Sequence, residues 1–129
     1  MTHRFPLRVY YEDTDFGGIV YYANYLKFIE RGRSEWVRDK GVDQVAMKRD
    51  DGVVFAVRRV EADYYSPARY DDELVVVTAV EAVTGARWIV RQTVERGGEV
   101  LFSALVTIVA INEAGAPTRL PAAFRRNLN

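Results

Sequence analysis

The 129-residue sequence contains no cysteine and only one histidine, and these absences exclude several kinds of chemistry. Without cysteine the chain cannot form a disulfide scaffold, a thiolate nucleophile or a cysteine-ligated zinc or iron–sulfur site. The single histidine, His3, falls where we expect a loose tail before the first strand. A Ser-His-Asp triad, a histidine general base and a multi-histidine metal site are therefore not expected. Carboxylates, lysine and tyrosine are the available proton-transfer groups.

The sequence also lacks an excess of charge and any long apolar run. Its 18 Lys+Arg residues balance 18 Asp+Glu residues, so no long-range field would gather nucleic acid or an anionic membrane. No segment approaches the ~18 consecutive apolar residues of a membrane span, and residues 1–6 contain no signal-peptide core. We expect a cytoplasmic protein with no nucleic-acid partner and no stable membrane insertion.

Apolar residues are plentiful enough for one globular domain, which we place over residues 1–129. They make up 49% of the chain. A domain of this length buries roughly two-thirds of the surface of its unfolded chain. No internal repeat or linker divides the sequence.

The order of the patterned segments predicts an α+β fold. A short strand is predicted at residues 7–13, and a helix at 21–40 has one face formed by Tyr22, Tyr25, Leu26, Ile29, Arg33, Trp36 and Val37. Four β-rich blocks follow, at residues 53–66, 73–84, 87–96 and 100–112, and short helices are expected within 41–51 and 121–127. The short connections between the later blocks make their strands antiparallel. We expect a five-stranded antiparallel sheet wrapped around one long central helix, with open edges that favour dimerisation.

The stretch from Tyr10 to Tyr25 combines acidic residues, paired glycines and the start of the predicted helix. Asp15 precedes Gly17 and Gly18, which would let a substrate approach the main chain closely. Free N–H groups at a helix start can bind an anion or a developing oxyanion. An aspartate at such a position is more often a turn or cap former. A metal site is not expected, because no further ligand accompanies Asp13 and Asp15.

Two segments of the chain resemble the hotdog-fold acyl-CoA thioesterases of the 4-hydroxybenzoyl-CoA thioesterase type, in particular the group associated with the Tol-Pal system. The first carries Tyr11-Glu12-Asp13-Thr14-Asp15, then Gly18, Val20-Tyr21, Asn24-Tyr25, Glu30 and Arg33; the second runs from Val60 to Leu74 and contains Ser66-Pro67-Ala68-Arg69. The resemblance implies a hotdog fold, a homodimer or homotetramer with sites at subunit interfaces, and hydrolysis of a short-chain or aromatic acyl-CoA. Because CoA is part of the substrate, no separate cofactor is implied.

Carried over by position, the family's catalytic aspartate falls on Asp15, and its oxyanion-binding N–H at the helix start falls on Tyr22. Many members carry histidine where this chain has Tyr22, so the substrate preference is expected to differ. The resemblance implies further substrate contacts from Gly17, Gly18, Val20, Tyr21, Asn24 and Tyr25.

This chemistry does not require a histidine. A thiol with a pKa near ~8.5 can leave as the thiolate without a general acid. Asp15 could attack the thioester carbonyl to give a mixed anhydride, or it could deprotonate an attacking water. The sequence leaves both routes open.

Glu30 is a reserve carboxylate, about two helical turns beyond Tyr22. We interpret it instead as an ion-pair partner of Arg33 at i,i+3. The CoA phosphates need cations, and the sequence does not choose among the candidates Lys48-Arg49, Arg58-Arg59, Arg87 and Arg125-Arg126.

Two other functions stay open at this point. A hotdog hydratase or dehydratase acting on acyl thioesters is disfavoured, because such a site usually resembles a histidine-plus-carboxylate pair. A non-catalytic acyl-CoA-binding accessory module would share the fold, since fold does not fix function. Asp15 beside Gly17-Gly18 favours catalysis, because binding alone does not need a carboxylate close to the thioester carbonyl.

Overall fold

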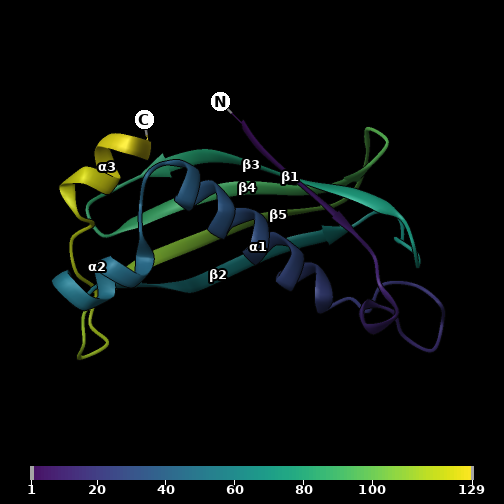
Figure 1. The fold of residues 1–129 in the computed structure, drawn as a ribbon, viewed down its shortest axis with the longest axis horizontal. Helices are drawn as coiled ribbons and strands as arrows, with labels where there is room; N and C mark the ends of the chain where they lie inside the picture. Colours follow the sequence, from purple (N-terminus) through teal and green to yellow (C-terminus); the bar gives the residue numbers. More distant parts are fainter. Residues whose placement is uncertain (1, 129) are drawn as a thin grey trace.

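Five antiparallel strands form one sheet that packs against the long helix α1 in the computed structural model, which describes residues 2–128 (Figure 1). The strands lie in the order β1-β3-β4-β5-β2. They span Thr2–Arg8 (β1), Val54–Tyr64 (β2), Glu73–Val83 (β3), Arg87–Arg96 (β4) and Glu99–Ile111 (β5). The helices are α1 (Asn24–Asp39), α2 (Gln44–Asp51) and α3 (Ala122–Leu128), with a 3-10 turn at Tyr11–Asp13. This is the α+β hotdog arrangement that we expected.

The alternating side chains of β4 and β5 face the core as predicted. In β4 the predicted inward face of Trp88, Val90, Gln92 and Val94 is buried, and in β5 so is that of Phe102, Ala104, Val106, Ile108 and Ala110. Short connections place β3 beside β4 and β4 beside β5 in antiparallel register. The four later strands therefore form close to their predicted bounds.

The predicted face of helix α1 is confirmed in part, because Tyr25, Ile29, Trp36 and Val37 are buried. Leu26 and Tyr22 are exposed, whereas Phe28 and Gly32 are buried. At Gly32 the helix comes so close to β3 that an added Cβ would lie 2.5 Å from Val76 Cγ1. A hydrophobic pattern gives no weight to glycine, so it could not show that this position faces the sheet.

The first strand lies earlier in the chain than predicted, and the placement of His3 in a loose tail is wrong. β1 covers Thr2–Arg8, and the residues after it form a 3-10 turn instead of a strand. His3 pairs with Thr78 of β3, and its Nε2 lies 2.9 Å from Asp39 Oδ2. Pro6 lies inside β1, and an edge strand tolerates proline because one row of its N–H groups faces away from the sheet.

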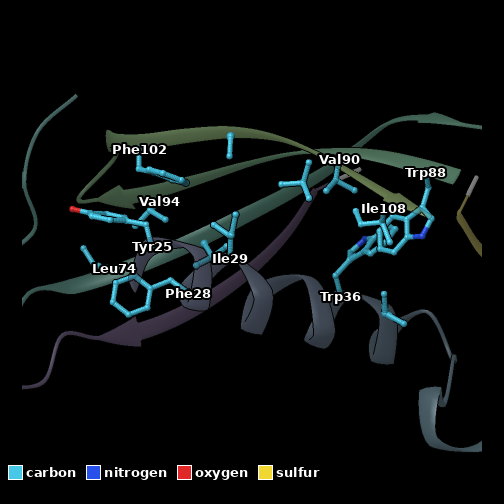
Figure 2. Packing of buried hydrophobic residues seen from close by; sticks show 14 of the residues in the cluster. Tyr25, Phe28, Ile29, Trp36, Leu74, Trp88, Val90, Val94, Phe102 and Ile108 are labelled. Atoms are coloured by element: carbon cyan, nitrogen blue, oxygen red, sulfur yellow. The ribbon is translucent and has the colours of Figure 1, made fainter. Parts of the chain in front are cut away.

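The core fills the space between α1 and the sheet (Figure 2). Trp36 and Trp88 pack at 5.4 Å near the C-terminal end of α1. Near its N-terminal end, Tyr25 stacks on Phe102 with their ring centroids 5.0 Å apart. The side chain of Tyr25 thus lies at the edge of the core, with its hydroxyl directed away from the other labelled residues (Figure 2).

Candidate active site

A cavity of about 370 Å³ opens at the end of the molecule where α1 begins. Its lining comes from the loop between β1 and α1 and from the end of β2 with the connection to β3, two segments that the Ile19–Arg69 bridge joins. Its walls are mainly aromatic and are formed by Asp15, Ile19, Val20, Tyr21, Tyr22, Tyr25, Tyr64, Tyr65, Ser66 and Pro67. The two segments that carry the family resemblance therefore build one site.

Hydrogen bonds to main-chain groups hold the two segments together. The Val20 N–H donates to the Ala68 carbonyl at 2.8 Å, and the Ala68 N–H donates to the Tyr25 hydroxyl at 3.0 Å. Buried Asn24 donates from its amide to the Asp13 carbonyl at 2.9 Å, which fixes the loop against the start of α1. The loop geometry is thus set by buried polar contacts.

Asp15 lies in a tight turn at the mouth of this cavity. Its Oδ1 accepts a hydrogen bond from the Gly17 N–H at 2.8 Å, and the Gly18 N–H donates to its carbonyl at 3.0 Å. Gly18 has φ +77°, a conformation that favours glycine. Within residues 2–128, Oδ2 of Asp15 has no hydrogen-bond donor. The turn therefore holds the carboxylate through one oxygen and leaves the other available.

Tyr22, a residue of the same wall, has an unoccupied main-chain donor. Helix α1 begins at Asn24 rather than at Tyr21, and its N-cap Ala23 supplies no side-chain cap. Among residues 2–128, neither the Tyr22 N–H nor the Ala23 N–H donates to a protein acceptor. Such free N–H groups at a helix start favour an anion.

Two tyrosines of the wall remain protonated phenols. Burial raises the pKa of Tyr25, against a smaller lowering by its bond from the Ala68 N–H. Burial also raises the pKa of Tyr64, and the nearby Tyr22 and Tyr25 add to this effect. The Tyr64 hydroxyl donates to the Tyr22 carbonyl at 3.0 Å. Both phenols are therefore hydrogen-bonding and wall groups near neutral pH.

The structure brings most of the predicted site residues together. Asp15, Val20, Tyr21, Tyr22 and Tyr25 line the cavity, Gly17 and Gly18 form the turn beside it, and Asn24 lies behind its wall. Tyr64, Tyr65, Ser66 and Pro67 were not singled out as site residues. The sequence indicated these four residues only through the second segment that resembles the family. No residue type in that segment is specific for catalysis.

The interpretation of Glu30 as the ion-pair partner of Arg33 is wrong. Glu30 accepts a hydrogen bond from Ser34, while Arg33 donates to the Gln92 side-chain oxygen at 2.9 Å. The fully buried Gln92 is fixed by its own donation to the Ile29 carbonyl at 2.9 Å. Burial lowers the pKa of Arg33, which Glu30 partly opposes. Glu30 does not line the cavity that contains Asp15.

None of the cations proposed for the CoA phosphates lines this cavity in the described chain. Arg49 pairs with Asp50, and Arg59 pairs with Glu61. Among residues 2–128, no three His, Asp or Glu side chains gather as metal ligands would. None of the described helices has the length and apolar character to cross a membrane.

An antiparallel sheet packed on one long helix is the fold of hotdog enzymes of the thioesterase class. The chain belongs to the thioesterase-like superfamily, whose family profile matches residues 9–128.

Individual relatives agree with this membership. The chain is similar to the acyl-CoA thioesterase YbgC of Haemophilus influenzae, at 40% identity over 108 residues that cover 84% of this chain and 79% of that protein. A probable thioesterase from Bartonella henselae has a similar crystal structure, with a TM-score of 0.90 at 42% identity over 94% of this chain and 100% of that one. A 4-hydroxybenzoyl-CoA thioesterase variant in complex with 4-hydroxybenzoyl-CoA shares the fold, with a TM-score of 0.93 at 20% identity over 99% of each chain.

Proposed function

We propose that this protein hydrolyses acyl-CoA thioesters at the cavity that contains Asp15. The observation that carries the proposal is that one cavity is lined both by Asp15, a carboxylate with one free oxygen, and by Tyr22, whose main-chain N–H is unoccupied among the described residues. Acyl transfer to water needs both groups, because the first supplies or activates the nucleophile and the second stabilises the oxyanion. The names of its relatives, which include acyl-CoA thioesterase and acyl-CoA thioester hydrolase, agree with this chemistry.

In this mechanism the thioester carbonyl oxygen is bound by the Tyr22 N–H. Attack at the carbonyl carbon gives a tetrahedral oxyanion, and one well-aimed donor lowers its free energy by about 3 kcal/mol. The intermediate then collapses with breakage of the C–S bond, and CoA departs as the thiolate. No histidine is required, and His3 lies at the other end of α1, about 24 Å away for a helix of 16 residues.

Asp15 can act in two ways that differ in the fate of a water oxygen. If Oδ2 attacks, a mixed anhydride forms, and its hydrolysis at the aspartyl carbon places a water oxygen in Asp15. If Asp15 deprotonates water, the water oxygen enters the acid product alone. A single turnover in H₂¹⁸O with enzyme in excess, followed by mass spectrometry of the peptide that contains Asp15, tests for a mixed anhydride that is hydrolysed at the aspartyl carbon. Label in Asp15 identifies nucleophilic attack.

The acyl group would enter the aromatic part of the cavity. Five tyrosines and Pro67 contribute to a volume of about 370 Å³, which suits a short or aromatic acyl group. CoA then belongs to the substrate, and no further cofactor takes part. We further propose a cytoplasmic location and, from the sequence resemblance, an association with the Tol-Pal system.

We also propose a homodimer that forms along β2. This strand is at the edge of the sheet, and its side chains opposite the buried row of β5 are open: Val57 is 47% exposed, Val60 37% and Tyr64 48%. An apolar edge strand is a template for pairing with a second copy. Because Tyr64 also lines the cavity, the partner would lie beside the site. Light scattering should give twice 14.7 kDa or more for the natural chain and a lower mass for Val60→Lys.

The experiment that tests the function follows CoA thiol release with a thiol-reactive dye, to which this cysteine-free protein adds no background. The substrates are acetyl-, butyryl-, hexanoyl-, palmitoyl- and benzoyl-CoA, and Asp15→Asn and Glu30→Gln are tested beside the natural chain. Hydrolysis that is lost in Asp15→Asn and retained in Glu30→Gln supports the proposal. Binding of every CoA ester without hydrolysis would favour the non-catalytic accessory module instead, and hydration of an enoyl-CoA would favour a hydratase.

A further inference from the structure

A second cavity lies between the second half of α1 and the start of β2. It has a volume of about 300 Å³ and shares no lining residue with the cavity that contains Asp15. One wall carries the polar side chains of α1, and the other walls are mainly apolar. The polar wall is formed by Glu30, Arg33 and Ser34, and the apolar walls include Phe55, Trp88 and Ile108 (Figure 2).

A buried amide fixes the direction of the Arg33 side chain. The Gln92 side chain is fully buried, and its amide nitrogen donates to the Ile29 carbonyl at 2.9 Å and to the Thr78 hydroxyl at 2.8 Å. Because both of its N–H groups are used, its oxygen is left to accept from Arg33 Nη1 at 2.9 Å. Residues of α1, β3 and β4 therefore hold one guanidinium in place.

This guanidinium lacks the acidic partner that a part-buried cation usually has. Among residues 2–128 its hydrogen bond goes to the neutral Gln92, and its remaining N–H groups have no protein acceptor. Glu30 lines the same cavity, but its carboxylate accepts from Ser34 and forms no ion pair with Arg33. Burial lowers the pKa of Arg33, as expected for a charge that has lost part of its hydration. A bound anion would offset the cost of that burial.

We propose that this cavity binds a free monocarboxylic acid with a short aliphatic or aromatic body, whose carboxylate accepts hydrogen bonds from Arg33. Pairs of arginine and carboxylate are frequently bidentate, because the planar guanidinium matches the two carboxylate oxygens. One cation between apolar walls favours a single negative charge over a phosphate group. The volume of about 300 Å³ is at the lower end for small-molecule sites, so the body of the acid is small.

The inference goes beyond the proposed function. Acids of this class include those that hydrolysis of short or aromatic acyl-CoAs would release, but Asp15 does not line the second cavity. Binding there requires no turnover, so it can be measured whether or not the protein hydrolyses acyl-CoA.

Methyl NMR resolves the two cavities in one titration. Ile108 lines the proposed site and Ile19 lines the cavity that contains Asp15, so their methyl signals report the two places separately. The probes are butyrate, hexanoate and benzoate at neutral pH, and butyramide and benzamide are uncharged matches of similar shape. Val57 at the rim also belongs to the edge at which we propose the dimer, so the natural chain is titrated in the assembly that it forms.

Two variants of α1 test the role of the cation. Arg33→Gln removes it, and Arg31→Gln is the matched control, because Arg31 is exposed on the same helix and does not line the cavity. We expect at least one acid to shift the Ile108 signal saturably. Arg33→Gln should weaken this binding at least about tenfold, and Arg31→Gln should leave it within about twofold.

Two further variants complete the test, and the melting temperature of every variant is measured first. If Arg33→Gln does not fold, Arg33→Lys takes its place; it keeps the charge but loses the planar fork, and should weaken binding by about threefold or more. Glu30→Gln removes a like charge from the same wall and should strengthen binding by about twofold or more. Weaker binding in Glu30→Gln would contradict an anionic ligand.

The proposed site is overturned if no acid shifts the Ile108 signal saturably, or if benzamide binds as well as benzoate. Equal losses in Arg31→Gln and Arg33→Gln would also overturn it, because they would show a general effect of charge. Shifts confined to Ile19 would place the acid in the cavity that contains Asp15 instead. These outcomes leave the proposed function standing, because release of CoA thiol tests it separately.

Discussion

Substitution of Gly32 by alanine measures how tightly α1 packs on the sheet. An added Cβ would lie 2.5 Å from Val76 Cγ1, whereas carbon atoms in ordinary contact are about 3.5–4.0 Å apart. Val76 is fully buried, so the helix must move away from β3 by roughly 1 Å or more. Overpacking of this kind costs about 1–3 kcal/mol, and the better helix propensity of alanine returns about 1 kcal/mol.

We therefore expect Gly32→Ala to lower the free energy of unfolding by up to about 2 kcal/mol and Tm by up to roughly 8 °C. Urea denaturation followed by circular dichroism measures the loss. Val76→Ala supplies the matched background, because it removes the methyl groups that the new Cβ meets. The Cβ at position 76 stays, 3.0 Å from the added Cβ, so in that background Gly32→Ala should destabilise less than in the natural chain. A Gly32→Ala single variant that is more stable than the natural chain by about 1 kcal/mol would refute the close approach.

Two further predictions concern the loops that build the site. Tyr25→Phe should lower the free energy of unfolding by about 1–3 kcal/mol, because the buried Ala68 N–H loses the acceptor that it has at 3.0 Å. A loss below ~0.5 kcal/mol in a urea titration would speak against that bond. Asp72 provides a pH-dependent prediction: burial acts to raise the pKa of its carboxyl, but hydrogen bonds from the Arg69 N–H and from Arg96 lower it overall. A lowered folded-state pKa adds stability above the unfolded value of about 3.9, and this stability is lost as the pH falls through the folded value. Asp72→Asn should therefore lower Tm at pH 7, with a difference that shrinks below about pH 4; an equal difference at both pH values would contradict the shift.

Most strands could be predicted because their periodicity and their turns agree. Four β-rich blocks with short connections leave little choice of pairing, and buried residues such as Trp88 and Phe102 alternate with partly exposed ones. The first strand could not be placed in the same way. β1 is an edge strand of alternately exposed and half-buried residues with a proline inside, so its local pattern is weak and its pairing with β3 stabilises it.

Part of the candidate site could be predicted from the sequence and part could not. Asp15, its glycines and the helix start lie close together in the sequence, so local turn chemistry and the family resemblance indicated them. Tyr64 could not be assigned to the site from the sequence, since the fold brings it to the cavity and to the Tyr22 carbonyl from 42 residues away. Arg33 was misassigned because helical spacing offers Glu30 as a partner, whereas the sheet places Gln92 beneath it.

The most direct test of the central claim is the comparison of acyl-CoA binding and turnover between the natural chain and Asp15→Asn. The asparagine oxygen can still accept from the Gly17 N–H, so the turn is retained while the reactive carboxylate is lost. Binding is measured by calorimetry and turnover by thiol release, with the preferred acyl-CoA. The proposed function predicts equal affinity and a kcat lowered by at least about 10³-fold. Undiminished turnover in a folded Asp15→Asn variant would contradict it.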